Sequence, residues 1–197
     1  MKLPAAEACI LCTQTAINNQ CFTDLSCEPT MLPFLPTLLS LLKLEQFKYR
    51  PLSSGEIELC QQVFGQRIDY SQVRIMNQPF LPWQSPHIIM APSGYIHTSD
   101  LHYKADYAHE SLGYQALLIH EMTHIYQYQQ GVNVLWHGAL LQSAFFLSLR
   151  KYNPYKYKLL PNKAFSDYNI EQQGDIARDI FLKKIPNIIL HPELIAP

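Results

Sequence analysis

The sequence predicts a mixed α+β fold, in which a small twisted sheet packs on one long helix and further helices surround it. Two patterns carry this prediction. Over 68–76 apolar and polar residues alternate, which is the period of a half-buried strand. From Ser111 onward apolar residues recur every three or four positions, which is the period of an amphipathic helix. At 197 residues, the chain is long enough to form one domain around one core.

The first part of the chain is expected to hold two helices. One is predicted over 30–47, where leucines recur at short intervals after a Pro-rich start. The second begins at Ser53 or Ser54, either of which can cap the first turn, and runs to about Val63. Gly65 then ends it, because glycine adopts the left-handed backbone at a helix C-terminus without steric cost.

Three short strands are expected next. After the alternating segment 68–76, residues 87–90 and 95–98 read as two strands joined by a Pro-Ser-Gly turn at 92–94. The segment 88–98 could offer a free edge to which an extended peptide adds as a further strand. An ordinary core hairpin explains the same residues equally well.

The second half of the chain reads as three helices. Gly131 fits the position just after the first of them. The second is apolar enough to be the more buried one, and an Asn-Pro pair at 153–154 breaks the pattern after it. Ser166 or Asp167 can cap the third, which ends in two lysines that suit the negative end of a helix. The predicted ranges are about 111–130, 134–149 and 168–184.

Composition excludes several classes of protein. Apolar residues make up 48% of the chain and charged residues 16%, so the chain is too apolar for intrinsic disorder. The formal net charge of −1 leaves no basic excess, so neither nucleic acid nor an anionic membrane is expected as the partner. The most apolar stretches contain prolines or polar residues, so no stable membrane insertion is expected. No Sec-type signal is recognised, so we expect synthesis in the cytoplasm and export by a non-Sec route.

Cysteines mark an N-terminal extension. Four of the five lie within residues 1–28, which are polar and weakly periodic. Free thiols, disulfide bonds and a zinc knuckle are all open for them, although the spacing of the second pair suits zinc poorly. We therefore expect an extension over 1–28, a folded domain over 29–185 and a tail over 186–197. The four clustered cysteines are Cys9, Cys12, Cys21 and Cys27.

The segment 120–124 carries the chemistry, because it reads His-Glu-Met-Thr-His within the first of the three helices. Four residues are about one helical turn, so His120 and His124 project from the same face and can bind one Zn²⁺ at about 2.0–2.1 Å each. Glu121 is rotated about 100° away, so it can serve as general base for a metal-activated water. The alternative is two surface histidines with a salt-bridging glutamate, which the flanking apolar residues disfavour.

A catalytic zinc needs a third protein ligand and an open position for water. Glu171 is the better candidate, and Asp175 follows one turn later, where it can hydrogen-bond a ligand histidine. Glu110, Asp167 and Asp175 itself compete as the third ligand. Alternatively, the carboxylates of Glu171 and Asp175 form a solvated helix face that pairs with Arg178.

With His120, Glu121, His124 and a glutamate about fifty positions further on, the chain resembles the gluzincin group of zinc metallopeptidases. The metzincin motif would continue with Gly at 127 and His at 130, and both positions hold glutamine. More loosely, the domain is similar to small zincin domains found beside Rhs and Vgr components of bacterial type VI secretion and toxin systems. The stretches that carry this likeness are 63–65 with 68–70, 119–124 with Gln127 and Gly131, and 168–173.

The resemblance implies a zincin-like fold around one zinc ion. It implies His120, His124 and Glu171 as the zinc ligands. It also implies Glu121 as the general base and Asp175 as the hydrogen-bond partner of a ligand histidine. The asparagine that usually precedes the glutamate ligand is Ile170 here. No motif locates the donor that stabilises the transition state, and its candidates are His137, Tyr155, Tyr157 and Tyr168.

Two functions follow from these patterns. The first is a zinc-dependent hydrolase of peptide or amide bonds, with a peptide, protein or peptidoglycan substrate, acting as a bacterial toxin or effector in the periplasm of a target cell. The second is a non-catalytic binding or adaptor module of a secretion apparatus on a zincin scaffold. An immunity protein or a part of the secretion apparatus would be the protein partner. The intact Glu121 favours the hydrolase, because a merely structural metal site does not need that base.

Overall fold

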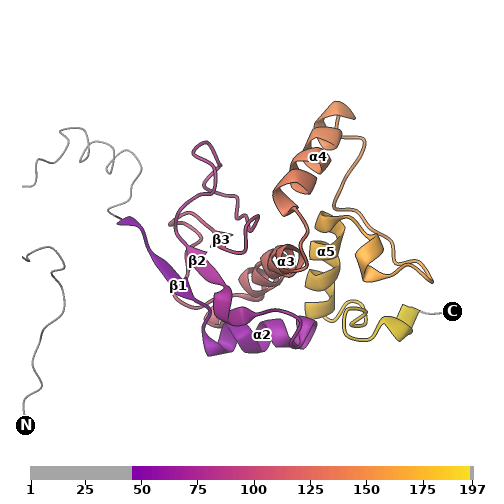
Figure 1. Ribbon diagram of the computed structural model, residues 1–197, viewed down its shortest axis with the longest axis horizontal. Coiled ribbons are helices and arrows are strands. Elements are labelled where there is room, and N and C mark those ends of the chain that lie inside the picture. The colour runs from indigo at the N-terminus through magenta and orange to yellow at the C-terminus, as the bar shows by residue number, and fades with distance from the viewer. Residues whose placement is uncertain (1–45, 196–197) are drawn as a thin grey trace, which may run out of the picture. The chain divides into compact units, whose positions relative to one another are not determined.

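The computed structural model describes residues 46–195, which form a mixed α+β fold as predicted (Figure 1). Over this range the chain forms four helices, one three-stranded sheet and several short 3-10 turns. The helix predicted over 30–47 lies almost wholly outside the described residues, as do the four clustered cysteines. In chain order the elements are β1 (Tyr49–Pro51), α2 (Ser54–Phe64), β2 (Arg74–Met76), β3 (Ile96–His97), α3 (Leu112–Gln129), α4 (Val134–Leu147) and α5 (Ile170–Phe181).

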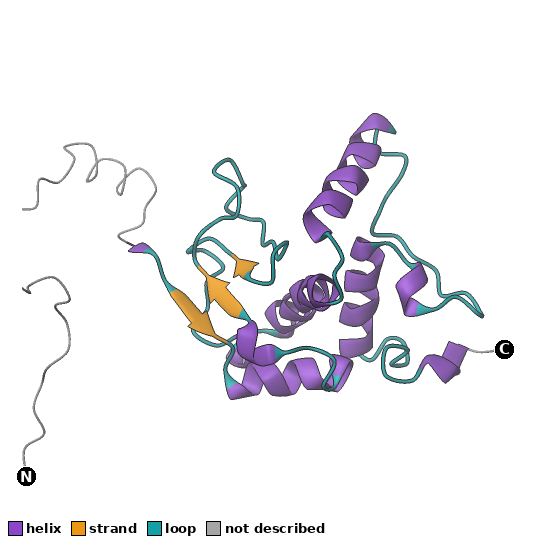
Figure 2. Ribbon diagram, viewed as in Figure 1, coloured by secondary structure: helices purple, strands orange, loops and turns teal. Residues whose placement is uncertain are grey.

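The sheet is built around β2, with β1 and β3 on either side (Figure 2). β1 pairs antiparallel to β2, with Arg50 opposite Ile75, and β3 pairs parallel to β2, with Ile96 opposite the same isoleucine. Both isoleucines are buried, so one face of this sheet contributes to the core. Beyond β3, Met90 and His97 form an isolated antiparallel bridge.

The strand predicted over 68–76 is mostly wrong, since only its last three residues pair as β2. The cause is local, because Asp69 begins a 3-10 turn and its Oδ1 accepts a hydrogen bond from the Ser71 amide at 3.1 Å. Aspartate side chains that bond to nearby amides favour turns over strands. The alternation of apolar and polar residues over 68–73 therefore does not reflect a strand, because the backbone turns there.

The two later strands are also shorter than predicted. Of 87–90 only Met90 pairs, and of 95–98 only β3 is a strand. The turn predicted between them is present, with Gly94 at a φ of +86°. β1 was not predicted, because three residues that end in proline are too few to show alternation.

Helix α2 begins and ends where the sequence predicted. Ser53 caps it, accepting from the Glu56 amide, and Glu56 bonds back to the Ser53 amide, which completes a capping box. Gly65 follows the helix at a φ of +57°. The buried Glu56 carboxylate also forms a two-pronged pair with Arg50, at 2.7 and 2.8 Å, and accepts from the Tyr107 amide. This carboxylate therefore ties β1, α2 and the segment before α3 together.

Helix α3 runs through the middle of the domain beside α5 (Figure 1). Gly131 follows it at a φ of +82°, as predicted for a residue just after a helix. Its apolar face packs on α5 and α2, so the segment 120–124 lies on a helix with many buried residues. The fully buried residues at this junction include Ile119, Met122, Ile125, Ile176, Val63 and Phe64.

Two helix predictions need correction. α5 begins after Asn169, which caps it with a capping box, and not after Ser166 or Asp167. The reason is that Phe165–Asp167 forms a separate 3-10 turn before the helix. The second helix, expected to be the more buried one, instead projects from the body as α4, and only its Val134 is buried (Figure 1).

The C-terminal segment returns to the core, where Ile188 and Ile189 are buried. No helix within residues 46–195 is long and apolar enough to cross a membrane.

Candidate metal centre

Helix α3 presents the two predicted histidines side by side. The ring centroids of His120 and His124 lie 5.1 Å apart with the planes at 76°, as expected for side chains one turn apart. His124 is buried, and the His120 side chain is only 12% exposed. This burial is incompatible with two surface histidines on a solvated helix.

Helix α5 supplies the carboxylate that meets them. Its capping box at Asn169 starts the helix two residues before Glu171, so this glutamate lies in the first turn. Glu171 Oε2 lies 3.5 Å from His120 Nε2 and 3.9 Å from His124 Nε2. One ligand atom from each of the three side chains lies within 4.8 Å of the other two. Ligands of a tetrahedral zinc at 2.0–2.1 Å are about 3.4 Å apart, so this triad fits one such ion with small adjustments.

The two other carboxylates that the sequence offered do not join the triad. Asp167 Oδ2 accepts from the Ala164 amide at 3.0 Å within its own 3-10 turn. Glu110 follows the 3-10 turn at 107–109 as its C-cap. Among residues 46–195, the one His, Cys, Asp and Glu group spaced to hold a metal is His120, His124 and Glu171.

Asp175, one turn further along α5, contacts His120 at the ring nitrogen Nδ1. Its Oδ1 lies 3.2 Å from His120 Nδ1 and 3.0 Å from Arg178 Nη1. In the neutral tautomer that binds a metal, this carboxylate would hold the proton on His120 Nδ1 and leave Nε2 free as the ligand atom. Asp175 therefore contacts both His120 and Arg178, but it is buried and does not form the solvated helix face that was the alternative.

Gly174 allows α5 to approach His120. A Cβ at this position would lie 2.6–2.8 Å from three atoms of the imidazole ring, which is closer than side-chain atoms pack. Only glycine leaves room for the ring between the two helices. No role was predicted for this residue, although a glycine inside a helix costs about 1 kcal/mol relative to alanine and so signals a packing constraint.

Gln127 positions the second histidine, a role that was not predicted, although this residue belongs to the likeness to small zincin domains. Its Nε2 donates to the Ile170 carbonyl at 3.0 Å and to Gln173 Oε1 at 2.9 Å. Its Oε1 must therefore accept from His124 Nδ1, which lies 2.9 Å away. This places the proton on Nδ1 and leaves His124 Nε2 as the free ligand atom. The same amide links α3 to the first turn of α5, where Glu171 lies.

The electrostatics of the triad favour an added positive charge. Burial alone would lower the pKa of His120, but hydrogen bonds to Asp175 and Glu171 raise it to about 10. Burial lowers the pKa of His124, and the charge on His120 lowers it further. Burial opposes ionisation of Glu171, yet its hydrogen bond with His120 and both nearby rings bring its pKa below the ordinary value. A divalent cation would supply the charge that the proton on His120 supplies here.

Glu121 lies beside the triad and is nearly unpartnered. Its side chain is buried, and its Oε2 has no hydrogen-bond partner within residues 46–195. Burial raises the pKa of Glu121 to about 8, against the opposing charge of His120. Because buried polar atoms are nearly always paired, an unpaired carboxylate oxygen in a cleft is a candidate for chemistry.

Of the four candidate transition-state donors, the structure brings only Tyr155 to the triad. Tyr157 donates its hydroxyl to Asp179 Oδ2 at 2.6 Å. Tyr168 donates to the Lys158 carbonyl at 3.0 Å. His137 lies on α4, and its Nδ1 is 2.8 Å from the Asn133 carbonyl.

Tyr155 lines the same cleft as His120, Glu121 and Glu171. Burial and the carboxylates of Glu171, Asp175 and Glu121 raise the pKa of Tyr155 to about 12. Its hydroxyl therefore stays protonated at neutral pH and can donate a hydrogen bond into the cleft.

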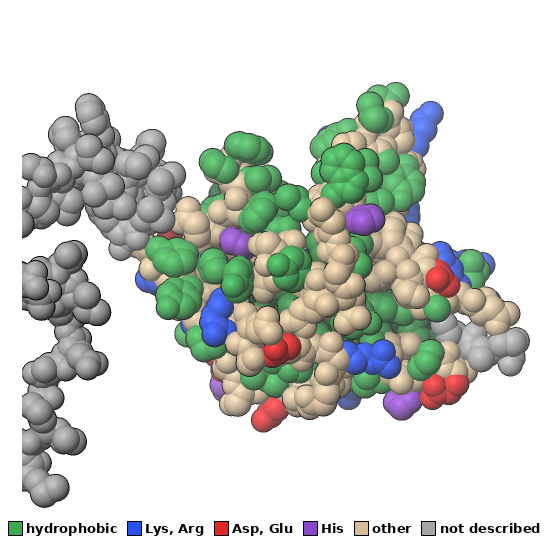
Figure 3. All heavy atoms as spheres, viewed as in Figure 1, with side chains coloured by type: hydrophobic (Ala, Val, Ile, Leu, Met, Phe, Trp, Pro, Cys, Tyr) green, Lys and Arg blue, Asp and Glu red, His purple; other side chains and the backbone are tan. Residues whose placement is uncertain are grey.

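The triad opens into a cleft of about 600 Å³ between α4 and the loop that joins β2 to β3. Figure 3 shows hydrophobic side chains gathered on these two projections, with a hollow between them. Apart from the triad and Glu121, the residues that line the cleft are mostly apolar. They are Leu81, Ile88, Ile89, Met90, Ala91, Pro92, Val134, Leu135, Gly138, Ala139, Gln142, Tyr155 and Ile170.

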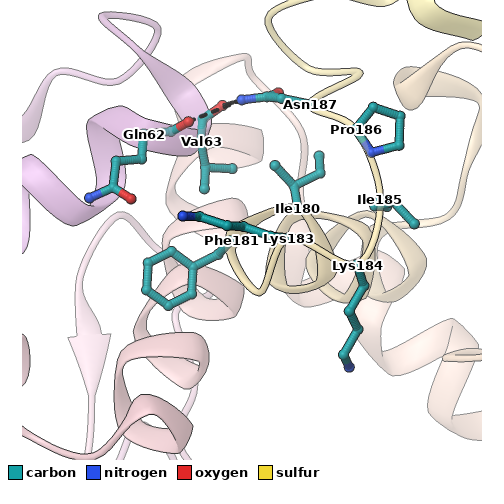
Figure 4. Close-up of a pocket in the computed structure, with 9 residues that line it drawn as sticks. All are labelled: Gln62, Val63, Ile180, Phe181, Lys183, Lys184, Ile185, Pro186 and Asn187. Atoms are coloured by element: carbon teal, nitrogen blue, oxygen red, sulfur yellow. Dashed lines mark hydrogen bonds between the residues drawn. The ribbon is translucent and has the colours of Figure 1, made fainter.

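A second hollow, of about 510 Å³, lies between α2 and the C-terminal end of α5 (Figure 4). Asn187 closes one side of it by donating to the Gln62 and Val63 carbonyls, both at 3.1 Å. Lys184 at its rim is paired with Asp179 at 3.0 Å. No member of the triad lines this hollow, and we assign it no chemistry.

Comparison with known proteins places this arrangement in a bacterial context. Over 136 residues, or 68% of the chain, the sequence is 52% identical to the type VI secretion system spike protein VgrG2b of Pseudomonas aeruginosa. The solved structure of the effector domain of Pseudomonas aeruginosa VgrG2b matches with a TM-score of 0.63 and 47% identity, covering 75% of this chain and 83% of that domain. The chain spans only 13% of the length of the spike protein. No model of a known protein family matches the chain.

Proposed function

The chain belongs to the family of the VgrG2b effector domain, and we propose that it is a zinc-dependent hydrolase of peptide bonds on a zincin-like fold. Its place in a type VI secretion system would be that of an effector, delivered by the secretion apparatus into a target cell by a non-Sec route. An immunity protein in the producing cell would be the second partner. The relatives' names support the context, whereas the chemistry is supported by the residues of the cleft.

One observation carries the chemical proposal, which is the buried carboxylate of Glu121 beside the triad. Its Oε2 has no partner in the described part of the chain, although it is buried. A structural metal site is closed by four protein ligands and has no use for a free carboxylate. This triad provides three ligands and opens to a cleft, which is the arrangement of catalytic zinc sites.

The residues divide the work among them. His120, His124 and Glu171 would hold the ion, which when bound supplies a Lewis acid for the scissile carbonyl and lowers the pKa of water. Glu121, whose pKa the positive charge of a bound ion would lower, takes a proton from the attacking water and passes it to the leaving amine. Tyr155 donates its hydroxyl proton in a hydrogen bond to the oxygen on which negative charge develops. Asp175 and Gln127 hold the two histidines with their Nε2 atoms toward Glu171.

The test compares the full chain with its Glu121→Gln variant. Metal content is measured by elemental analysis, and cleavage is measured on an unbiased peptide library and on purified peptidoglycan. Glu121→Gln keeps the shape of the side chain, so we expect equal zinc content and melting temperature but a loss of activity of at least about 100-fold. Expression in the periplasm of a bacterial host should be toxic for the parent chain and harmless for the variant.

Glu58→Gln is the matched control, because Glu58 lies exposed on α2. It should leave metal content, activity and toxicity unchanged. A Glu121→Gln protein as active as the parent would refute the hydrolase. A zinc-loaded parent chain that is inert on every substrate would instead favour the adaptor module.

A further inference from the structure

We infer that this site cleaves polypeptides beside a large apolar side chain, and that the amide bonds of the cell wall are not its substrate. The inference rests on the proposed hydrolase and names its substrate class. It depends on the walls of the cleft and not on the metal ligands.

The cleft recognises apolar groups because of what is missing from its walls. Among the described residues that line it, the only charged or titrating groups near the triad are the triad itself, Glu121 and the tyrosine hydroxyl. Gln142 contributes the one other polar side chain. The remaining wall is formed by aliphatic side chains, by Pro92 and by small residues. A charged substrate group placed against this wall would lose water and find no partner on it, whereas an apolar side chain gains from the same burial. Asp175 and Arg178 line a separate, smaller hollow that also borders His120, Glu121 and Tyr155.

Cell-wall peptides suit this surface poorly. Their glycan and stem-peptide portions carry hydroxyl, amino and carboxylate groups, which need polar partners once they are buried. A volume of about 600 Å³ lies in the range of ligand sites that enclose several groups at once. A polypeptide segment with a Leu or Phe side chain beside the scissile bond fits both the size and the chemistry of the cleft.

Gly138 locates the subsite for that side chain. It lies on α4 and lines the cleft opposite Ile170, the residue directly before Glu171. A Cβ at this position would meet only Ile170 Cδ1, at 3.9 Å, so the space above it is free. Because glycine weakens a helix interior relative to alanine, helix formation does not explain its presence here. The missing side chain leaves room in the cleft next to the metal ligands.

The experiment uses the zinc-loaded full chain and peptides that differ only at the positions flanking the scissile bond. Peptides with Leu or Phe at one of these positions should be cleaved with kcat/KM roughly 10- to 100-fold above those with Asp, Lys or Gly. Isolated peptidoglycan should release no fragments. Gly138→Leu fills the subsite, so its kcat/KM for the Phe peptide should fall at least about 10-fold, while an Ala peptide keeps most of its rate.

Gly113→Leu is the matched control, because Gly113 also lies in a helix and a Cβ there meets only Ser111 Oγ, at 3.8 Å. It should retain the preference of the parent chain. Zinc content should be equal in all three proteins, so a change in preference cannot come from the metal.

Cleavage of peptides without an apolar preference would overturn the inference and leave the hydrolase standing. Release of peptidoglycan fragments would do the same, as would a Gly138→Leu protein with unaltered preference. A parent chain that cleaves neither peptides nor peptidoglycan would remove the proposed function itself and the inference with it.

Discussion

Substituting alanine for Gly174 should disable the proposed metal centre without unfolding the domain. The added Cβ would lie 2.6–2.8 Å from Cε1, Nδ1 and Nε2 of His120, and ordinary contact begins at about 3.4 Å. The ring must therefore retreat by about 0.6–0.8 Å, or α5 must move by a similar amount. Metal sites tolerate ligand displacements of only about 0.2 Å, so either movement takes His120 out of register with Glu171 and His124.

The two consequences of Gly174→Ala differ in size. We expect zinc affinity to fall by at least 10- to 100-fold, because a ligand ring is displaced and its hydrogen bond to Asp175 is broken. Stability should change less. Alanine strengthens the helix by about 1 kcal/mol, while overpacking costs about 1–3 kcal/mol, so the net loss should be no more than about 2 kcal/mol.

Zinc competition with a chromophoric chelator measures the first effect, and urea unfolding of the metal-free protein measures the second. Gly113→Ala, at an open helical position, serves as the control and should leave zinc affinity unchanged. Zinc affinity of Gly174→Ala equal to that of the parent chain would show that the close approach of α5 to His120 does not position the ligand.

Two further substitutions separate positioning from folding. Gln127→Ala removes the acceptor for His124 Nδ1 and should lower zinc affinity about 10- to 100-fold. Gln130→Ala, at an exposed position after α3, should leave zinc affinity unchanged, and equal affinities for the two variants would contradict the role of Gln127. Glu56→Ala leaves Arg50 and two backbone amides without their buried partner, so urea unfolding should show a free energy of unfolding lower by about 3–5 kcal/mol. Glu58→Ala should lower it by less than about 0.5 kcal/mol. A loss below about 1 kcal/mol for Glu56→Ala would contradict a stabilising role of the buried carboxylate.

The parts of the site that lie on one helix could be predicted from the sequence. The relation of His120, Glu121 and His124 follows from the turn of the α-helix alone, because it needs no knowledge of packing. The position of the proposed third ligand could not be predicted in this way, since it depends on how α5 packs against α3. Residue order left four carboxylates in competition, and only the packed structure brings Glu171 to the histidines.

The residues that position His120 and His124 could not be predicted from helix geometry. Gln127 and Gly174 act across the boundary between α3 and α5, through a hydrogen bond and through the absence of a side chain. Neither glutamine nor glycine has a sequence pattern that would predict such a role. The strands failed for a related reason, because segments of two or three residues are defined by their partners and carry too little period of their own.

Helix α4 is apolar in sequence but largely exposed in the structure. A helix that is apolar on all sides is normally buried, and this was the prediction for 134–149. In the structure only Val134 is buried, and Leu147 is 84% exposed. Apolar composition therefore did not predict how exposed this helix is among residues 46–195. The side of α4 that carries Gly138 lines the cleft beside the triad, so the proposed substrate would cover that side, whereas the exposed Trp136 and Leu147 lie outside the cleft lining.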